Sequence, residues 1–183
     1  MPLPDLAPIE SPRLTLRPVV GADLADLLAV NGDPEVTRFL PYTTWRSMDD
    51  AVAWLGRMEA LATAGTGQQL VVERRSDAKV IGTVLLFKHD EPSRRVELGY
   101  ALGRADWGQG CMREALGALC TRAFASGQLR RLEAEVNPAN RASCRLLESL
   151  GFALEGRLRQ RWVAQGVAYD TRLYGLLADD GHG

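Results

Sequence analysis

The chain has 183 residues, of which 46% are hydrophobic and 25% charged, and its formal net charge is -1. This length suffices for one domain with a hydrophobic core, and the balanced charge gives no support to a nucleic-acid or anionic membrane partner. No apolar run is long enough to span a bilayer. Three cysteines without C-x-x-C spacing, and first residues unlike a signal peptide, predict reduced thiols in a cytoplasmic protein. The two histidines have no ligand spacing, so we expect no metal site.

The folded part is expected to begin after a short arm. Residues 1–10 contain prolines and an aspartate, so we expect a flexible N-terminal arm, then a domain over residues 11–178 and a disordered tail over 179–183. Polar and apolar residues alternate from Arg13 to Arg17. This alternation predicts a strand, which Pro18 ends.

The next stretch has the spacing of helices. Leu24, Leu27 and Leu28 recur at helical intervals, and Asp23 is placed to cap the first helix. The elements that follow are a short helical turn over residues 35–40, a loop over 41–47 and a second helix over 48–64. Gly65 signals the end of that helix.

The hydrophobic period then changes to the alternation of strands. Three runs, over residues 69–74, 80–88 and 95–102, are joined by short turns, which predicts an antiparallel meander. In the third run Val96 and Leu98 lie on one face and Glu97 on the other.

Helices and strands alternate in the rest of the chain. The expected elements are a helix over residues 112–125, a strand over 132–136, a helix over 141–150, and a closing hairpin of 153–163 and 169–177 around Gln165-Gly166. The strand, helix and strand between residues 95 and 136 predict a right-handed crossover. The whole order predicts a single α+β domain whose central sheet is mixed, mostly antiparallel and flanked by helices.

A glycine-containing turn stands at the centre of this order. Gly108 and Gly110 separate the third meander strand from a helical pattern. Glycine lets the backbone approach a ligand closely, and the free N–H groups and positive dipole end of a helix favour an anion such as phosphate. A short glycine motif also occurs as a turn without a ligand, so both interpretations remain open on this stretch alone.

Several motifs in order give the chain a family resemblance. They are Ser11-Pro12-Arg13-Leu14-Thr15-Leu16-Arg17, Asp33-Pro34-Glu35-Val36, Glu97-Leu98-Gly99-Tyr100, Trp107-Gly108-Gln109-Gly110 with Glu114-Ala115, Asn137-Pro138-Ala139-Asn140-Arg141-Ala142-Ser143, Glu148-Ser149-Leu150-Gly151-Phe152 and Glu155-Gly156. Together they resemble the GNAT N-acetyltransferases, and within them the Rim-type enzymes that acetylate protein N-termini, including those of ribosomal proteins. The resemblance covers nearly the whole chain and implies a GNAT-like fold, acetyl-CoA as co-substrate and an acceptor amine.

The resemblance also implies where acetyl-CoA binds. The backbone N–H groups that would hold its pyrophosphate belong to Gln109, Gly110, Cys111, Met112 and Arg113. The pantetheine arm would add along the third meander strand where it splays from its neighbour, against Ala101 and Leu102. This loop departs from the family at two positions. Cys111 stands where the family often has an aromatic residue, and Met112 stands where it usually has a small one, Ala or Gly. Met112 would crowd the phosphates if its side chain pointed inward, although a residue at a helix start is expected to point away.

Acetyl transfer needs a neutral amine and a proton for the departing thiolate. The tyrosine that supplies this proton in many GNAT enzymes is replaced here by Leu147, and the Rim-type resemblance points to Ser143 instead. Asn140 would bind the pantetheine or cap the last helix. The best candidate for a base is Glu97, acting through a water, although a solvated strand carboxylate is the alternative.

The acceptor should enter between the first two helices and the closing hairpin. Tyr42, Trp45 and Trp162 are candidates to line that groove, and the alternative is that they pack a loop onto the domain. Trp162 also stands where some Rim-type enzymes carry a glutamate. Tyr100 and Trp107 we expect to pack in the core rather than to take part in the chemistry.

Three functions are consistent with these residues. The first is acetyl transfer from acetyl-CoA to a protein N-terminal α-amino group by direct attack in a ternary complex. The second keeps acetyl-CoA but transfers to a small amine or an aminoglycoside. The third is a catalytically weak acyl-CoA-binding regulator. The resemblance is compatible with a homodimer, but the sequence specifies no interface.

Overall fold

The computed structural model describes residues 3–164 and 166–180, and its strands form one eight-stranded sheet. The strands are β1 (Ile9–Glu10), β2 (Leu14–Pro18), β3 (Gly67–Arg74), β4 (Lys79–Asp90), β5 (Arg95–Leu102), β6 (Arg131–Val136), β7 (Ala153–Ala164) and β8 (Val167–Leu177). Their order in the sheet is β1-β2-β3-β4-β5-β6-β8-β7. All these pairs are antiparallel except β5 with β6, so the expected mixed, mostly antiparallel sheet is confirmed.

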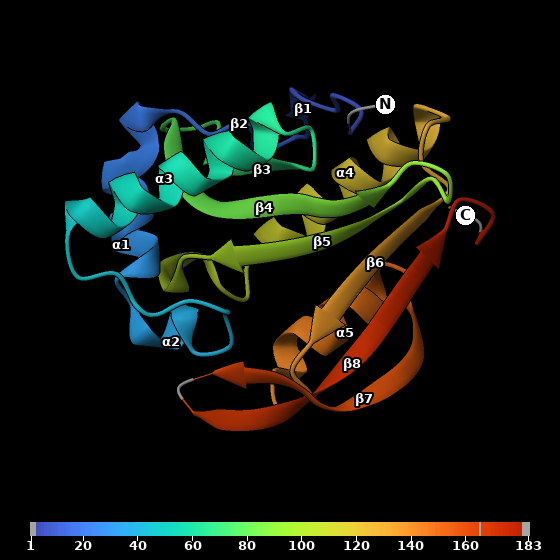
Figure 1. Ribbon diagram of the computed structural model, residues 1–183. Helices are drawn as coiled ribbons and strands as arrows, with labels where there is room; N and C mark the ends of the chain where they lie inside the picture. The colour runs from blue at the N-terminus through green and yellow to red at the C-terminus, as the bar shows by residue number, and fades with distance from the viewer. Residues whose placement is uncertain (1–2, 165, 181–183) are drawn as a thin grey trace.

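Helices cover both faces of the sheet. They are α1 (Leu24–Asn31), α2 (Pro34–Thr37), α3 (Met48–Thr63), α4 (Cys111–Ala125) and α5 (Arg141–Ser149), with 3-10 turns η1 (Gly21–Asp23) and η2 (Arg104–Asp106). Figure 1 shows α1 and α3 in front of the first half of the sheet and α4 behind it. The helices therefore follow the order that the sequence predicts, and the path from β5 through α4 to β6 supplies the parallel pair.

Two hydrophobic clusters hold these layers together. The larger lies on the side of α4 and includes Leu70, Val72 and Leu116, all fully buried. The smaller lies beneath α1 and α3 and includes Leu27 and Val71. Neighbouring residues of β3 thus point into opposite clusters, as the two faces of a strand require.

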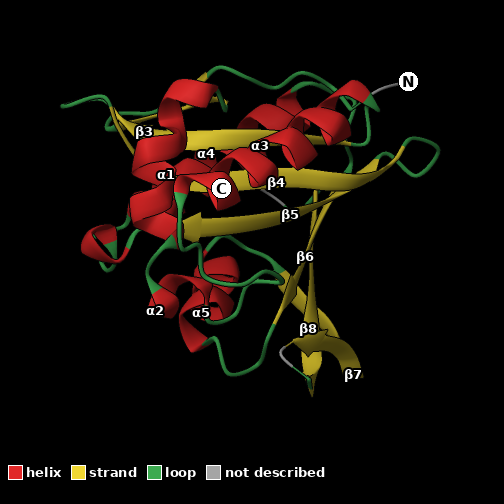
Figure 2. Ribbon diagram, turned by 60° about the vertical axis from the view of Figure 1, so that its left-hand side comes forward, coloured by secondary structure: helices red, strands yellow, loops and turns green. Residues whose placement is uncertain are grey.

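The sheet divides into two parts at the parallel pair. β5 and β6 pair at three positions, from Arg95 with Arg131 to Glu97 with Glu133. Beyond them the strands diverge, and β6, β8 and β7 turn away from β5 (Figures 1 and 2). The divergence leaves one edge of β5 without a strand partner from Leu98 onward.

The N-terminal segment differs from the expected loose arm. Leu6 and Ile9 are 1% and 6% exposed in the larger cluster, and Ile9 and Glu10 pair with β2. Because two apolar side chains are buried, this segment packs on the domain. At the other end residues 179–180 lie in a turn closed by Asp180, and the rest of the expected tail, 181–183, is outside the described residues, as is Gln165 of the hairpin turn.

Asp23 also differs from its expected role as a helix cap. Its side chain makes no capping bond to α1. Instead its carboxylate accepts hydrogen bonds from the backbone N–H of Val20 and from the Arg17 guanidinium. A buried carboxylate needs such partners, and here a charged one was available from β2.

Candidate active site

The glycine turn before α4 exposes the backbone start of a helix. Gly108 and Gly110 have φ angles of 72° and 76°, in the left-handed region that glycine adopts without strain. No side chain caps the helix that follows. The first N–H groups of a helix have no partner within it, so this turn presents donors to an anion.

The two unusual residues of this turn point away from it. The side chains of Cys111 and Met112 are each 5% exposed and belong to the larger hydrophobic cluster. Met112 therefore does not crowd the space in front of the helix start. The backbone of residues 109–113 and the exposed side chain of Arg113 remain the groups that face outward there.

Arg13, which directly precedes β2, bonds to the same turn. Arg13 donates from Nη1 to the carbonyl of Gln109 at 3.0 Å and from Nε to Glu114 at 2.6 Å. Glu114 also accepts from the Ser11 hydroxyl at 2.8 Å. Burial opposes ionisation of Glu114, but the hydrogen bonds from Arg13 and Ser11 outweigh it and hold its pKa below the usual value. The ion pair between Arg13 and Glu114, with the hydrogen bond to Gln109, thus connects the glycine turn to the N-terminal part of the sheet.

The open edge of β5 leads from this turn toward the middle of the sheet. Ala101 and Leu102 lie beyond the last position that pairs with β6, so that edge is available for hydrogen bonding. The Leu102 carbonyl already accepts from the Trp107 indole at 2.7 Å. Trp107 is 45% exposed, so the expectation that it packs in the core is wrong. The indole covers the end of β5 instead.

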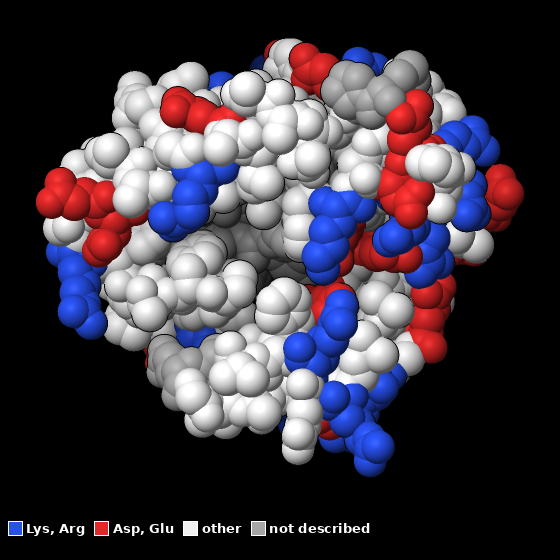
Figure 3. Space-filling view, in the orientation of Figure 1, with Lys and Arg blue, Asp and Glu red and all other residues white. Residues whose placement is uncertain are grey.

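A cavity of about 430 Å³ opens between the β4–β5 face and the β7–β8 hairpin. Figure 3 shows the hollow near the centre of this face, with basic side chains on both sides of it. α3 and the loop after α2 complete its walls. The apolar lining includes Phe39, Leu40, Tyr42, Met58, Phe87 and Trp162, and the polar lining includes Glu97, Glu135, Asn140 and Ser143.

Glu97 lies in this cavity as a buried carboxylate. It is 6% exposed and accepts a hydrogen bond from Lys88 Nζ at 2.7 Å. Burial raises the pKa of Glu97 above its usual value, and the pairing with Lys88 opposes that shift. The alternative of a solvated strand carboxylate is therefore wrong, because the side chain is withdrawn from solvent.

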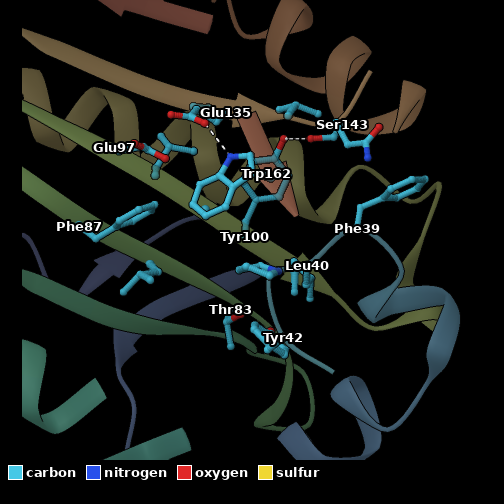
Figure 4. Close-up of a pocket in the computed structure, with 18 of the residues that line it drawn as sticks. Phe39, Leu40, Tyr42, Thr83, Phe87, Glu97, Tyr100, Glu135, Ser143 and Trp162 are labelled. Carbon is cyan, nitrogen blue, oxygen red and sulfur yellow. Dashed lines mark hydrogen bonds between the residues drawn. The ribbon is translucent and has the colours of Figure 1, made fainter. Parts of the chain in front are cut away.

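A second carboxylate, Glu135 of β6, stands close to the first. It accepts from the Trp162 indole N–H at 2.8 Å and lies 3.9 Å from Lys88 Nζ. Figure 4 shows Glu97 and Glu135 on the same side of Trp162. Two carboxylates and one ammonium group thus meet at this end of the cavity.

Ser143 and Tyr100 form a hydroxyl pair at the other end. The two oxygens are 2.6 Å apart, so one hydroxyl donates to the other (Figure 4). Burial raises the pKa of Tyr100, which keeps the phenol protonated. The helix is capped by Asn140, whose side chain accepts from the Ser143 N–H at 3.2 Å, and this leaves the Ser143 hydroxyl free of that task.

Leu147 does not take part in this pair. It lies on the same helix as Ser143 but is fully buried in the larger cluster. The phenol that lies next to Ser143 of α5 belongs instead to Tyr100 of β5. The sequence expectation placed Tyr100 in the core alone, whereas it packs partly against the cluster and also lines the cavity.

The three aromatic residues expected to meet the acceptor separate into two groups. Tyr42 and Trp162 line the cavity, and the Tyr42 hydroxyl donates to Asn31 at 2.9 Å. Trp45 is 6% exposed in the smaller cluster, with its ring centroid 5.4 Å from that of Trp54. Trp45 is therefore a packing residue, which was the alternative that the sequence left open.

Sequence reasoning missed Lys88, Glu135 and the polar role of Tyr100. Lys88 and Glu135 lie on different strands, and their spacing in the chain gives no sign that they meet. Tyr100 carried a weak signal, because its hydroxyl had to find a partner on an otherwise apolar strand face. These contacts depend on how far β6 diverges from β5.

Comparison with known proteins assigns the family. A family model described as an acetyltransferase (GNAT) domain matches residues 13–153. The chain belongs to the GNAT acetyltransferases. It is similar to an uncharacterized N-acetyltransferase, p20, of Bacillus licheniformis, with 35% identity over 165 residues that cover 90% of this chain and 93% of that protein. The GNAT resemblance drawn from the motifs is confirmed, and the chain is an acetyl-CoA-dependent N-acetyltransferase.

Two further relatives carry more specific names. A ribosomal-protein-serine acetyltransferase of Escherichia coli (strain K12) is 34% identical over 97 residues, which cover 52% of this chain and 54% of that protein. A solved structure of RimL, a ribosomal L7/L12 alpha-N-protein acetyltransferase in complex with coenzyme A, superposes with a TM-score of 0.85 at 21% identity, covering 96% of this chain and 100% of RimL. At that identity the RimL likeness supports the GNAT fold.

Two kinds of site are not found in the part of the chain that the structure describes. No helix there has the length and apolar character needed to cross a membrane. Within the same residues no group of three or more histidine, cysteine or acidic side chains is gathered in a way that could hold a metal ion.

Proposed function

We propose that this GNAT enzyme acetylates the α-amino group of a protein N-terminus, by direct attack of the amine on acetyl-CoA in a ternary complex. The observation that carries the proposal is the opening between β5 and β6, which has a hydroxyl pair at one end and a buried carboxylate at the other. The Rim-type motifs and the similarity to a ribosomal-protein-serine acetyltransferase support a protein N-terminus as acceptor.

Acetyl-CoA fits the features that lead into this opening. Its pyrophosphate would accept hydrogen bonds from the backbone of Gln109, Gly110, Cys111, Met112 and Arg113. Its pantetheine arm would follow the open edge of β5 at Ala101 and Leu102. Trp107 already occupies the Leu102 carbonyl, so the arm would either displace the indole or bond to the Leu102 N–H on the same edge.

The thioester would then lie between the two polar ends of the cavity. Glu97, acting through a water, would take a proton from the acceptor ammonium group, and the neutral amine would attack the carbonyl carbon. The C–S bond breaks as the N–C bond forms. The nitrogen would then pass its surplus proton to the Ser143 hydroxyl, which would give its own proton to the CoA thiolate. Tyr100 would orient the Ser143 hydroxyl through their 2.6 Å hydrogen bond, because burial raises the pKa of the phenol and keeps it protonated.

The lining of the cavity favours a peptide over an aminoglycoside. A polycationic sugar needs several carboxylates, whereas the described lining of this cavity contains two, Glu97 and Glu135. The aromatic walls, with Tyr42 and Trp162, suit an apolar first side chain of a peptide. An α-amino group has a pKa of about 7.7–8.0 and asks less of a base than lysine does, with about 10.4.

Mass spectrometry of an acceptor panel with acetyl-CoA tests the proposal. The panel contains peptides with a free N-terminus and no lysine, the same peptides with a blocked N-terminus and one lysine, and small amines. We expect acetylation of the free N-termini, and much less for the blocked peptides. If no acceptor is modified although calorimetry detects CoA binding, and Ser143→Ala changes nothing, the protein is a CoA-binding regulator instead.

A further inference from the structure

We infer that Glu97, Glu135, Phe87 and Trp162 form a subsite for a primary ammonium group, and that Lys88 fills this subsite until an acceptor amine displaces it. The inference rests on the proposed function, because it places the acceptor amine beside Glu97. The new element is that the Lys88 side chain competes with the acceptor for this subsite and thereby reduces the apparent affinity of the enzyme for the acceptor.

The surroundings of the Lys88 ammonium are those of a bound ligand. Its Nζ lies 2.7 Å from Glu97 and 3.9 Å from Glu135. It also lies 5.3 Å from the ring centroid of Phe87 and 5.7 Å from that of Trp162, within the range of cation–π contacts. Carboxylates and aromatic faces together are the groups by which proteins recognise an alkylammonium ion.

Lys88 enters this subsite from the solvent side. Its side chain is 44% exposed, whereas those of Glu97 and Glu135 are 8% exposed. A ligand that arrives through the cavity mouth can therefore take the place of the ammonium group without disturbing the buried carboxylates. Figure 4 shows Phe87, Glu97, Glu135 and Trp162 around one end of the cavity.

The backbone of Lys88 is held in an uncommon conformation. Its φ angle is 53°, in the left-handed region, and the register of β4 with β5 shifts between Phe87 and Asp90. Such a conformation costs free energy for a residue with a side chain. In a regular strand the side chains of Phe87 and Lys88 would point to opposite faces. The irregularity instead brings the Lys88 ammonium group to the side of Phe87, where it reaches Glu97.

Composition sets Lys88 apart from the other basic residues. The chain has 22 lysines and arginines, and Lys79 and Lys88 are its only lysines. An arginine would present a planar fork, whereas lysine presents a compact ammonium group of the kind that an acceptor carries. Of the nearby arginines, Arg95 and Arg131 hold Glu133, whereas Arg161 donates to Glu135 at 3.4 Å and so shares that carboxylate with the subsite.

Displacement has a measurable consequence for the acceptor. A ligand that must displace a resident group binds with an apparent affinity reduced by the fraction of protein in which the site is free. If the subsite is free about one-tenth of the time, removal of Lys88 lowers the apparent KM for the acceptor by about tenfold. If the acceptor ammonium binds away from these carboxylates, removal of Lys88 leaves that KM unchanged.

A binding test with a small ammonium ion needs no acetyl transfer. The proteins are the wild type, Lys88→Ala, and Lys79→Ala as the matched loss of the other lysine. Thermal unfolding is measured with n-propylammonium chloride and with tetramethylammonium chloride at equal ionic strength. We expect n-propylammonium to raise the Tm of Lys88→Ala only, and tetramethylammonium, which donates no hydrogen bond, to leave all three unchanged. No specific stabilisation of Lys88→Ala would overturn the inference.

Kinetics with the acceptor peptide supply the second readout. We expect Lys88→Ala to lower the apparent KM for the peptide, and Lys88→Met, which keeps the length without the charge, to do the same. Lys79→Ala should match the wild type. An unchanged or raised KM in both Lys88 variants would overturn the inference while acetyl transfer itself still stood. If n-propylammonium binds to Lys88→Ala but no peptide is acetylated, the subsite stands and the proposed acceptor falls.

Discussion

The two ends of the active site are built in different ways. The end proposed to bind acetyl-CoA, called here the donor end, is a contiguous stretch from Trp107 to the start of α4, where no side chain caps the backbone N–H groups. The acceptor end is assembled from side chains of β4, β5, β6, α5 and β7, such as Lys88, Glu97, Glu135 and Ser143. A backbone site depends on local conformation and tolerates changes of side chain. A side-chain site depends on how distant elements pack.

This difference explains why the donor end accommodates unusual residues. Cys111 and Met112 depart from the usual GNAT pattern, yet their side chains are buried in the cluster behind the turn. The backbone donors are unaffected by which apolar side chain packs there. At the other end Leu147 stands where many GNAT enzymes carry a tyrosine, and the hydroxyl groups near it are those of Ser143 on the same helix and of Tyr100 on β5.

The largest effect is expected for Trp45→Ala. Comparison with Trp162→Ala distinguishes a residue that packs in the core from one that lines the acceptor cavity. Trp45→Ala removes a buried indole from the smaller cluster and should lower the free energy of unfolding by about 3–5 kcal/mol. Chemical denaturation measures this loss. Trp162→Ala is the contrast, because it lines the cavity and should raise the acceptor KM with a smaller loss of stability. Equal stability losses in the two variants would contradict this assignment.

The next effect tests the hydroxyl pair. Ser143→Ala should lower kcat by about 100-fold, because the thiolate loses its proton donor. Tyr100→Phe keeps the packing of the ring but removes its hydroxyl, so a smaller loss is expected. Steady-state kinetics with acetyl-CoA at saturation give both values. An unaltered kcat in Ser143→Ala would show that the thiolate leaves without this donor.

The effect of Glu97 should depend on pH. Glu97→Gln removes the proposed base, and below about pH 7 we expect kcat/KM to fall by about 100-fold. The loss should shrink above about pH 8, where an α-amino group is already neutral. Burial raises the pKa of Glu97, so the wild-type kcat/KM should fall with decreasing pH from above the usual glutamate range, as the carboxylate becomes protonated.

The control for this profile is Glu133→Gln. Glu133 pairs in register with Glu97 but is held by Arg95 and Arg131. Its removal takes away a negative charge that helps to raise the pKa of Glu97, so the acidic limb should move slightly to lower pH, without the fall in kcat/KM expected for Glu97→Gln. A profile of Glu97→Gln that is parallel to the wild type at every pH would exclude Glu97 as the base.

The smallest effect is expected at the donor end. Gly110→Val places a branched residue at a φ angle of 76°, which costs about 1–2 kcal/mol if the turn is kept. A turn that relaxes instead moves its N–H groups, so CoA should bind about tenfold more weakly, as titration calorimetry would measure. Met112→Ala should leave CoA affinity nearly unchanged, because that side chain points into the core. Strong loss of CoA binding in Met112→Ala would contradict the backbone character of this site.

Much of the fold was predictable because its signals are local. The apolar period of α3 and α4, the alternation in β3 to β5 and the glycine turn are each contained within one stretch of chain. The N-terminal arm was predicted wrongly because it lacks such a local signal. Leu6 and Ile9 have no periodic pattern of their own, and they are buried because a surface made by other elements receives them.

The sequence by itself therefore determined the order of helices and strands, the helix start that can hold an anion, and the residues Ser143 and Glu97 as candidates. Only the tertiary structure decided that Tyr100 contacts Ser143, that Lys88 lies between Glu97 and Glu135, and that Trp45 is buried. The physical reason is range. Backbone conformation is set by neighbours in the chain, whereas the pairing of buried polar side chains depends on where β6 separates from β5.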